Sequence, residues 1–486
     1  MKDFASSALD TATQLGADYA DVRVIDERSR ALATKNGKIG TASDARSQGF
    51  NVRVLVNGAW GFASSADMGR KAVEATAARA VEIAEASAKV KQSDVKLVPE
   101  KAVTAEWTTP YKIDPFTISI ERDLALLQKI DAELRSVKGV TLAETNMNFR
   151  REEQWFLSSE GANIHQTKFT TGAGYVAYAF AGSEIQKRSY PNSFGGQWQN
   201  KGYELIHELK LVENARRIGE EAVALHSADQ CPQGVFDIIL ESSQLGLQIH
   251  ESVGHPIELD RVLGMEANFA GTSFLTLDKL RTLKYGSEIV NVVADARQEH
   301  GPGLGTFAFD DEGVPAQCTP IISDGLFTGY LSSRETAALI GLQRSGGTLR
   351  AENWNRLPII RMTNISILPG ETPLTLEQLI ASTDHGVLFQ TNRSWSIYDK
   401  RYNFQFGTEI GWEIKNGKRA RMLKNPSYSG ITTEFWNSMD AICSRDEWTL
   451  WGTPNCGKGQ PQQVMGTGHG ASPARFRKVK VGSAYS

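Results

Sequence analysis

Residue types that bind metals and move protons stand close together in the stretch SSQLGLQIHESVGHPIELD, residues 242–260. His250 and Glu251 are adjacent, and His255 follows five positions after the first histidine. Neutral imidazoles bind zinc-like ions, and a carboxylate beside such an ion can take the proton of a metal-activated water. The stretch therefore predicts a metal site at His250 and His255, with Glu251 as the general base.

The interval of five residues between His250 and His255 constrains the backbone. The H-E-x-x-H motif uses an interval of four, which puts both histidines on one face of a helix. On a regular helix an interval of five separates them by about 140°, too divergent for one ion. Because Gly254 tolerates unusual dihedral angles and Pro256 biases His255 away from the α region, we expect a π-bulge or a helix end just before His255. The alternative is two ordinary hydrogen-bonded histidines.

A zinc-like ion bound by two imidazoles needs a third protein ligand and leaves one position for water. Sequence spacing does not choose among the candidates, which are Glu258, Glu266, His300, Asp310, Cys456 and His469. Cys456 stands in the glycine-flanked segment TPNCGKGQP, a setting that suits a metal-directed thiolate on a loop or an ordinary loop cysteine. His469, in GTGHGA, is expected in a glycine-rich turn.

Other conspicuous residues are expected to have no catalytic role. Asp310, Asp311 and Glu312 precede Gly313 and predict an acidic turn, which could line the site but is expected to be solvated. The segment GKGQ, residues 457–460, lacks the Ser or Thr of a phosphate-binding P-loop, so no nucleotide site is assigned to it.

Composition bounds the class of protein. The chain has 486 residues, 41% hydrophobic and 22% charged, which is typical of a soluble protein with more than one domain. A net charge of -3 predicts no nucleic-acid partner and no membrane-surface binding. The four cysteines are widely spaced, and the first residues lack the basic flank and apolar run of a signal peptide. We therefore expect a cytoplasmic protein.

The N-terminal segment, residues 1–95, predicts a sandwich-like α+β unit. Asn36-Gly37 and Asn57-Gly58 supply the positive φ angles that tight antiparallel hairpins require. An alanine-rich stretch without proline predicts a closing helix over 66–90. The expected strands are 21–30, 31–39 and 50–56.

Two further segments follow. Residues 96–230 predict a central α+β segment with helices over 118–134 and 204–224. Residues 231–486 contain many glycines, prolines and short apolar runs, which predicts a mainly antiparallel β domain that carries the metal site. The expected fold class of the whole chain is therefore α+β.

Several sequence blocks resemble the TldD/PmbA family of metallopeptidases, and specifically its TldD-type branch, which bears the metal motif. The blocks are GADYADVRV, VRVLVNGAWGFAS, IHESVGHPIELDR, FDDEGVPAQ, DGLFTGYLSSRETA and NCGKGQPQQVMGTGHGASPARFR. The resemblance implies that His250, His255 and Cys456 hold one divalent metal ion per active subunit. Glu251 would then be the catalytic base. This donor set suits zinc and is compatible with iron.

The resemblance also implies hydrolysis of peptide bonds in unfolded or small peptides, in degradation or maturation. The expected assembly is a dimer, either of identical chains or with a paralogous subunit that lacks the motif. Two other functions remain open: a non-catalytic, metal-stabilised subunit of a peptidase complex, and a metal-dependent amidase that acts on small modified amines. The sequence does not specify the peptide preference or endo- versus exopeptidase action.

Overall fold

Tight turns organise the first strands of the chain. The computed structural model describes residues 1–268 and 271–483. Asn36-Gly37 and Asn57-Gly58 adopt positive φ angles and join the first three strands into antiparallel hairpins, which confirms their prediction. The expected break near residue 30 is wrong, because one strand of 17 residues runs without interruption to the Asn36 turn.

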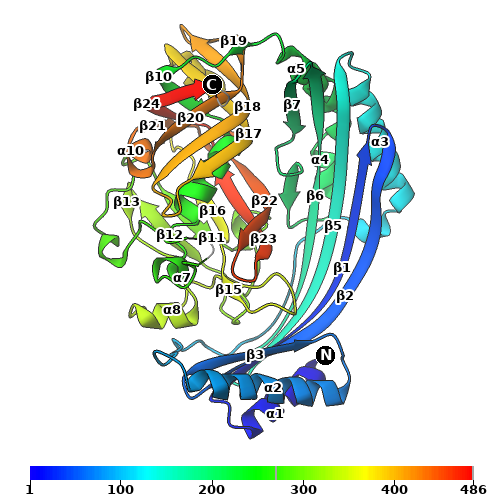
Figure 1. Ribbon diagram of the computed structural model, residues 1–486, viewed down its shortest axis with the longest axis vertical. Helices are drawn as coiled ribbons and strands as arrows, with labels where there is room; N and C mark the ends of the chain where they lie inside the picture. Colours follow the sequence, from blue (N-terminus) through cyan, green and yellow to red (C-terminus); the bar gives the residue numbers. More distant parts are fainter. Residues whose placement is uncertain (269–270, 484–486) are drawn as a thin grey trace.

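These strands belong to a long curved eight-stranded sheet, with the C-terminal half of the chain on its concave side (Figure 1). The strand order is β3-β2-β1-β5-β6-β4, and β7 and β8 also pair with β6. Only β4 runs parallel to its neighbour β6. The strands are β1 (Tyr19–Lys35), β2 (Lys38–Val56), β3 (Ala59–Ser65), β4 (Thr104–Thr108), β5 (Val140–Ser158), β6 (Asn163–Ala181), β7 (Glu184–Tyr190) and β8 (Gln197–Gln199).

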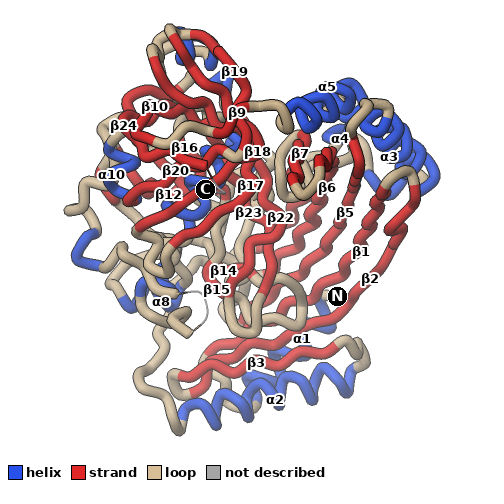
Figure 2. Tube along the Cα trace, turned by 45° about the horizontal axis from the view of Figure 1, so that its top comes forward, coloured by secondary structure: helices blue, strands red, loops and turns tan. Residues whose placement is uncertain are grey.

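Two groups of helices cover opposite ends of this sheet (Figure 2). One core lies under α1 and α2 and includes Val22 and Val24; a second lies under α3 and α5 and includes Leu32. The predicted helices 66–90 and 118–134 are confirmed, whereas the helix expected over 204–224 is split where Lys210 adopts a positive φ. The bounds are α1 (Lys2–Gln14), α2 (Arg70–Ala88), η1 (Pro115–Thr117), α3 (Ile120–Arg135), α4 (Glu204–Glu208) and α5 (Leu211–Ala224).

The C-terminal half contains a small closed barrel. β17 pairs with both β10 and β18, and the ring closes through β24 and β20. Aromatic rings such as Phe389, Phe406 and Tyr428 belong to its buried core. The strands of this sheet are β9 (Asp229–Gln230), β10 (Gly234–Leu240), β17 (His385–Ile397), β18 (Asn403–Lys415), β19 (Lys418–Lys424), β20 (Pro426–Ile431), β21 (Met439–Ile442) and β24 (Ala474–Ser483).

A six-stranded sheet beside the barrel has the order β13-β12-β11-β16-β23-β22. Its strands are β11 (Val292–Asp295), β12 (Cys318–Ser323), β13 (Leu326–Phe327), β16 (Asn364–Ile367), β22 (Thr449–Lys458) and β23 (Gln463–Ala471), and a separate ribbon pairs β14 (Leu349–Arg350) with β15 (Ile359–Ile360). The remaining helices are α6 (Ser242–Ile249), η2 (His250–Gly254), α7 (Leu259–Val262), η3 (Leu277–Lys279), η4 (Gln298–His300), α8 (Arg334–Leu339), α9 (Leu376–Ala381), α10 (Thr432–Asn437) and η5 (Arg445–Glu447).

The α+β fold class is confirmed, with a mainly antiparallel C-terminal half. The division at residues 95 and 230 stays a prediction; the segments 1–95 and 96–230 contribute strands to one shared sheet while keeping separate helix-covered cores. Among the described residues, no helix combines the length and the apolar character that crossing a membrane requires.

Buried charges join the long sheet to the C-terminal half. Asp311 accepts hydrogen bonds from Arg23 at 3.0 Å, from Gln154 at 2.9 Å and from the backbone of Ala351 at 2.7 Å. The expectation that 310–312 form a solvated acidic turn is therefore wrong. All three side chains are buried: Asp311 and Glu312 face donors of the long sheet, and Asp310 accepts from backbone N–H groups of the C-terminal half.

We expect Asp311→Ala to destabilise the protein by about 3–5 kcal/mol, since it leaves the guanidinium of Arg23 buried without its carboxylate. The free energy of unfolding, measured by denaturant titration, tests this. Asp446→Ala, which removes an exposed carboxylate, is the control and should change it by less than about 0.5 kcal/mol. Equal, small effects of both substitutions would contradict a structural role for the buried charges.

Candidate metal centre

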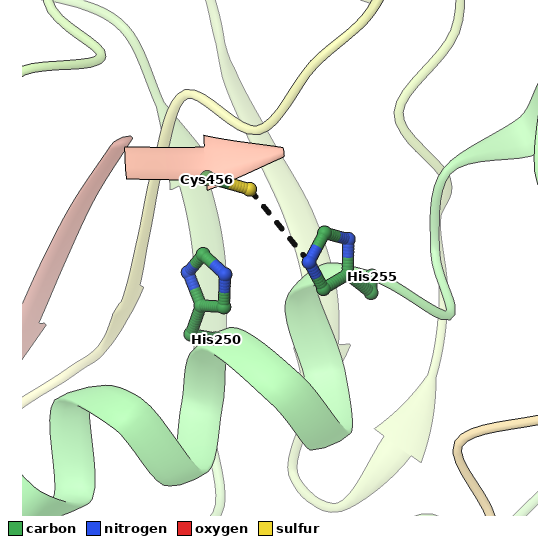
Figure 3. A group of neighbouring side chains, drawn as sticks. All are labelled: His250, His255 and Cys456. Atoms are coloured by element: carbon green, nitrogen blue, oxygen red, sulfur yellow. Dashed lines mark hydrogen bonds between the residues drawn. The ribbon is translucent and has the colours of Figure 1, made fainter. Parts of the chain in front are cut away.

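A π-helical turn brings the two motif histidines together. Helix α6 continues directly into η2, where the backbone N–H of His255 donates to the carbonyl of His250 at 3.2 Å. This i to i+5 bond widens the helix by one residue, so both imidazoles face the same side. Their ring centroids lie 4.9 Å apart (Figure 3). The predicted π-bulge is confirmed.

The surroundings of the π turn explain why it forms. A Cβ atom on Gly254 would collide with the sulfur of Met362, so only glycine allows this close packing. The hydroxyl of Ser252 accepts from the indole of Trp436 at 2.9 Å and ties the turn to α10. The effect expected of Pro256 is wrong, because His255 keeps α-region angles of φ -68 and ψ -41.

Cys456 approaches the two histidines from the opposite side, on strand β22 (Figure 3). Its Sγ lies 3.7 Å from Nε2 of His255, and the ligand atoms of His250, His255 and Cys456 all lie within 4.8 Å of one another. The expectation of a loop position is wrong. A register shift between Thr453 and Cys456 interrupts the ladder with β23, and such bulges re-aim side chains.

The electrostatics of these three buried residues favour the forms that bind metals. Burial lowers the pKa values of His250 and His255, which keeps both imidazoles neutral. Burial alone would raise the pKa of Cys456, but the guanidinium of Arg361 and the His255 ring outweigh it and hold the pKa below the usual thiol range. Arg361 also donates to the backbone carbonyl of Cys456.

Behind His255 lies a cluster of buried charges. The Nδ1 atom of His255 lies 3.0 Å from a carboxylate oxygen of Glu258, so a proton on Nδ1 is held there and Nε2 faces the cysteine. Arg261 donates to the same carboxylate at 3.2 Å. Lys458 lies 3.5 Å from Glu258 and donates to both oxygens of Asp260 at 2.8 Å. Lys458, Arg261 and His255 lower the pKa of Glu258 against the opposing effect of burial.

His250 is oriented by another histidine. Its Nδ1 lies 2.7 Å from Nε2 of His469, and Nδ1 of His469 lies 3.2 Å from the carbonyl of Ile365. A carbonyl only accepts, so His469 carries its proton on Nδ1 and accepts the proton of His250 at Nε2. This leaves Nε2 of His250 with a free lone pair. The expectation of a glycine-rich turn is wrong, because His469 is a buried residue of β23.

Glu251 lies one residue from His250 and forms an ion pair with Arg401. Nη1 of Arg401 lies 2.6 Å from Oε2 of Glu251, and the two side chains are 15% and 7% exposed. Arg401 belongs to the turn between β17 and β18, 150 residues further along the chain. Sequence reasoning did not identify it, because no local motif surrounds this arginine.

The structure separates the remaining third-ligand candidates from this group. His300 is 53% exposed and pairs with Asp295, and Asp310 accepts backbone hydrogen bonds within its own turn. Glu258 and His469 contact the histidines from outside, and Glu266 does not belong to the group either. Among the described residues, His250, His255 and Cys456 form the one group of three or more His, Cys, Asp or Glu side chains placed to share an ion.

Comparisons with known proteins indicate one family of metallopeptidases over most of the chain. Profiles of the PmbA/TldA metallopeptidase domain 1, central domain and C-terminal domain match residues 20–84, 113–227 and 233–483. A metalloprotease of Methanothermobacter thermautotrophicus is 30% identical over 96% of this chain and 95% of its own. A zinc metalloprotease TldD homolog of Saccharolobus solfataricus is 24% identical over 97% and 98%. The solved structure of TldE from Thermococcus kodakarensis aligns with a TM-score of 0.73 at 16% identity, over 99% and 100% of the chains.

In the metal-free protein, we expect Cys456 to ionise before the other three cysteines as the pH rises. Its pKa is lowered, whereas burial raises those of Cys231 and Cys443 to about 12 and that of Cys318 to about 11. The ultraviolet absorbance of the Cys456 thiolate should therefore appear at a lower pH than that of the other three thiolates. Cys456→Ser should abolish this early signal. A signal that survives the substitution would contradict the assignment.

Proposed function

Because the chain belongs to the PmbA/TldD family of metallopeptidases, we propose that it hydrolyses peptide bonds at a metal ion held by His250, His255 and Cys456. Glu251 is the general base. The observation that carries the proposal is the convergence of three buried ligand atoms within 4.8 Å of one another. Family membership makes the chain a metallopeptidase; the residue roles are our inference.

The donor set fits one divalent ion per subunit. Two imidazole nitrogens and one thiolate suit zinc and are compatible with iron. The name of the zinc metalloprotease relative from Saccharolobus solfataricus supports zinc. Three protein ligands leave a fourth position for water, which supports catalysis over a purely structural metal site.

When bound, the ion would lower the pKa of a coordinated water toward about 7 and polarise the scissile carbonyl. Glu251 accepts a proton as the water oxygen forms its bond to the carbonyl carbon. It then gives that proton to the leaving amine nitrogen as the carbon–nitrogen bond breaks. His469 and Glu258 hold the Nδ1 protons of His250 and His255 in place, which leaves Nε2 of each ring free to bind the ion.

A cavity of about 280 Å³ lies between the long sheet and the C-terminal half. Pro454 and Met465 of the β22–β23 hairpin belong to its lining, whereas Glu251 and the three candidate metal ligands do not. Its size is at the lower end of ordinary ligand pockets, which have volumes of about 300–1,000 Å³. Unfolded or small peptides are therefore proposed as substrates on the basis of family membership and not of this cavity.

We further propose that the active form is a dimer, either of this chain with itself or with a paralogous subunit. The structural likeness to TldE from Thermococcus kodakarensis supports a paralogue of the same fold. The four cysteines are free, which supports a reducing compartment such as the cytoplasm. Action on small modified amines is the second candidate function, and profiling with peptides and with amides of small amines separates the two.

We expect Glu251→Gln to keep the metal and lose at least 100-fold in kcat, because the neutral amide cannot take up the proton of the attacking water. Cys456→Ser should instead lose metal affinity, since a neutral hydroxyl replaces a thiolate. Metal content and cleavage of an unstructured peptide library, measured on both variants and the wild type, test this. Full activity of Glu251→Gln, or wild-type metal affinity of Cys456→Ser, would refute the respective role.

A further inference from the structure

Arg401 contacts Glu251 but has no role in the hydrolysis proposed above. Its side chain is 15% exposed, and its Nη1 lies 2.6 Å from the carboxylate of Glu251, the residue next to His250. Its Nε–H is buried and has no hydrogen-bond partner among the described residues. Buried donors of native proteins are nearly always paired, so an orphaned one calls for an explanation. An ion pair that only neutralised Glu251 would not require a free donor at this place.

The backbone holds Arg401 in an unfavourable conformation. Its φ of +65 lies in the left-handed region, which residues with a side chain rarely adopt. The turn is fixed by the N–H of Arg401, which donates to the carbonyl of Tyr398 at 2.6 Å, and by the hydroxyl of Thr432, which donates to the carbonyl of Arg401 at 2.8 Å. Strain of this kind persists where the surroundings enforce it, and it clusters at functional sites.

The location of Glu251 defines where a substrate must lie. A water that Glu251 deprotonates sits within about 3 Å of its carboxylate. The carbonyl carbon that this water attacks lies about 3–3.5 Å further on. Arg401 already touches the carboxylate, so its free N–H groups can reach the oxygen of that carbonyl. A preorganised donor placed where negative charge develops is a large source of catalysis.

We propose that Arg401 is a catalytic residue of this centre, whose guanidinium holds Glu251 through Nη1 and donates a hydrogen bond to the scissile carbonyl oxygen as it becomes anionic. The proposal rests on the proposed function, because it assumes that Glu251 activates the attacking water. The bonds made and broken are those of peptide hydrolysis, and Arg401 keeps its protons throughout.

The test compares Arg401→Ala and Arg401→Lys with the wild type in the metal-loaded protein. Lys400→Ala, an exposed neighbour in the same turn, is the matched control. On a short peptide substrate, we expect kcat of Arg401→Ala to fall about 100- to 1,000-fold with a smaller change in KM and unchanged metal content. Methylguanidinium added to Arg401→Ala should restore part of the activity. An unchanged or increased kcat would overturn the proposal, since Arg401 would then either have no effect on the rate or inhibit Glu251 as a base.

Binding of a peptide phosphonate distinguishes a direct contact of Arg401 with the transition state from an effect of Arg401 through Glu251 alone. Its tetrahedral anion stands in for the transition state. We expect Arg401→Ala to weaken phosphonate binding at least tenfold more than Glu251→Gln does. Equal losses in the two variants would show that Arg401 acts only through the glutamate, and would overturn the proposal. If Arg401→Ala does not fold, Arg401→Lys takes its place in the comparison of phosphonate binding with Glu251→Gln. Lysine keeps the charge but lacks the forked donors of arginine.

Different results would contradict the proposed function and the role of Arg401. If the wild type shows no metal-dependent cleavage, or if Glu251→Gln cleaves normally, the proposed function is wrong. If Glu251→Gln is inactive while both Arg401 variants match the wild type, only the role of Arg401 is wrong.

Discussion

The i to i+5 hydrogen bond between His250 and His255 is the constraint on which the centre depends. A regular helix would turn the second imidazole away, and the cysteine of β22 would then face only one nitrogen ligand. The π turn survives because packing around it is close: Met362 fills the space a side chain on Gly254 would need, and Trp436 donates to Ser252. The geometry of the site is therefore set by the core of the C-terminal half.

Around this turn, cationic side chains stabilise the buried thiol and carboxyl groups in their charged forms. Arg361 lowers the pKa of Cys456, while Lys458 and Arg261 lower that of Glu258. Buried charges are tolerated when each is paired and hydrogen-bonded. The same pairing fixes the protonation pattern of the imidazoles, because Glu258 and His469 each face one Nδ1 atom. Structural stability and readiness to bind an ion thus come from the same contacts.

The sequence predicts those parts of the fold and of the candidate site that depend on residues close together in the chain. Hairpins at Asn36-Gly37 and Asn57-Gly58 follow from backbone preferences of these residues. The π turn at His250 is predicted from the interval of five between the histidines, although Pro256 does not act on the backbone as expected. The family resemblance supplied Cys456 as a metal ligand, since spacing alone had left six candidates.

The remaining features depended on tertiary contacts. The turn at Asp311 is buried because Arg23, 288 residues away, faces it. His469 and Arg401 reach the centre from β23 and from the β17–β18 turn, and no nearby residue pattern marks either one. X-ray absorption spectroscopy of the metal in the purified protein tests the central claim most directly. The account predicts one sulfur at about 2.3 Å and two imidazole nitrogens at about 2.0–2.1 Å. A first shell of nitrogen and oxygen without sulfur would contradict it.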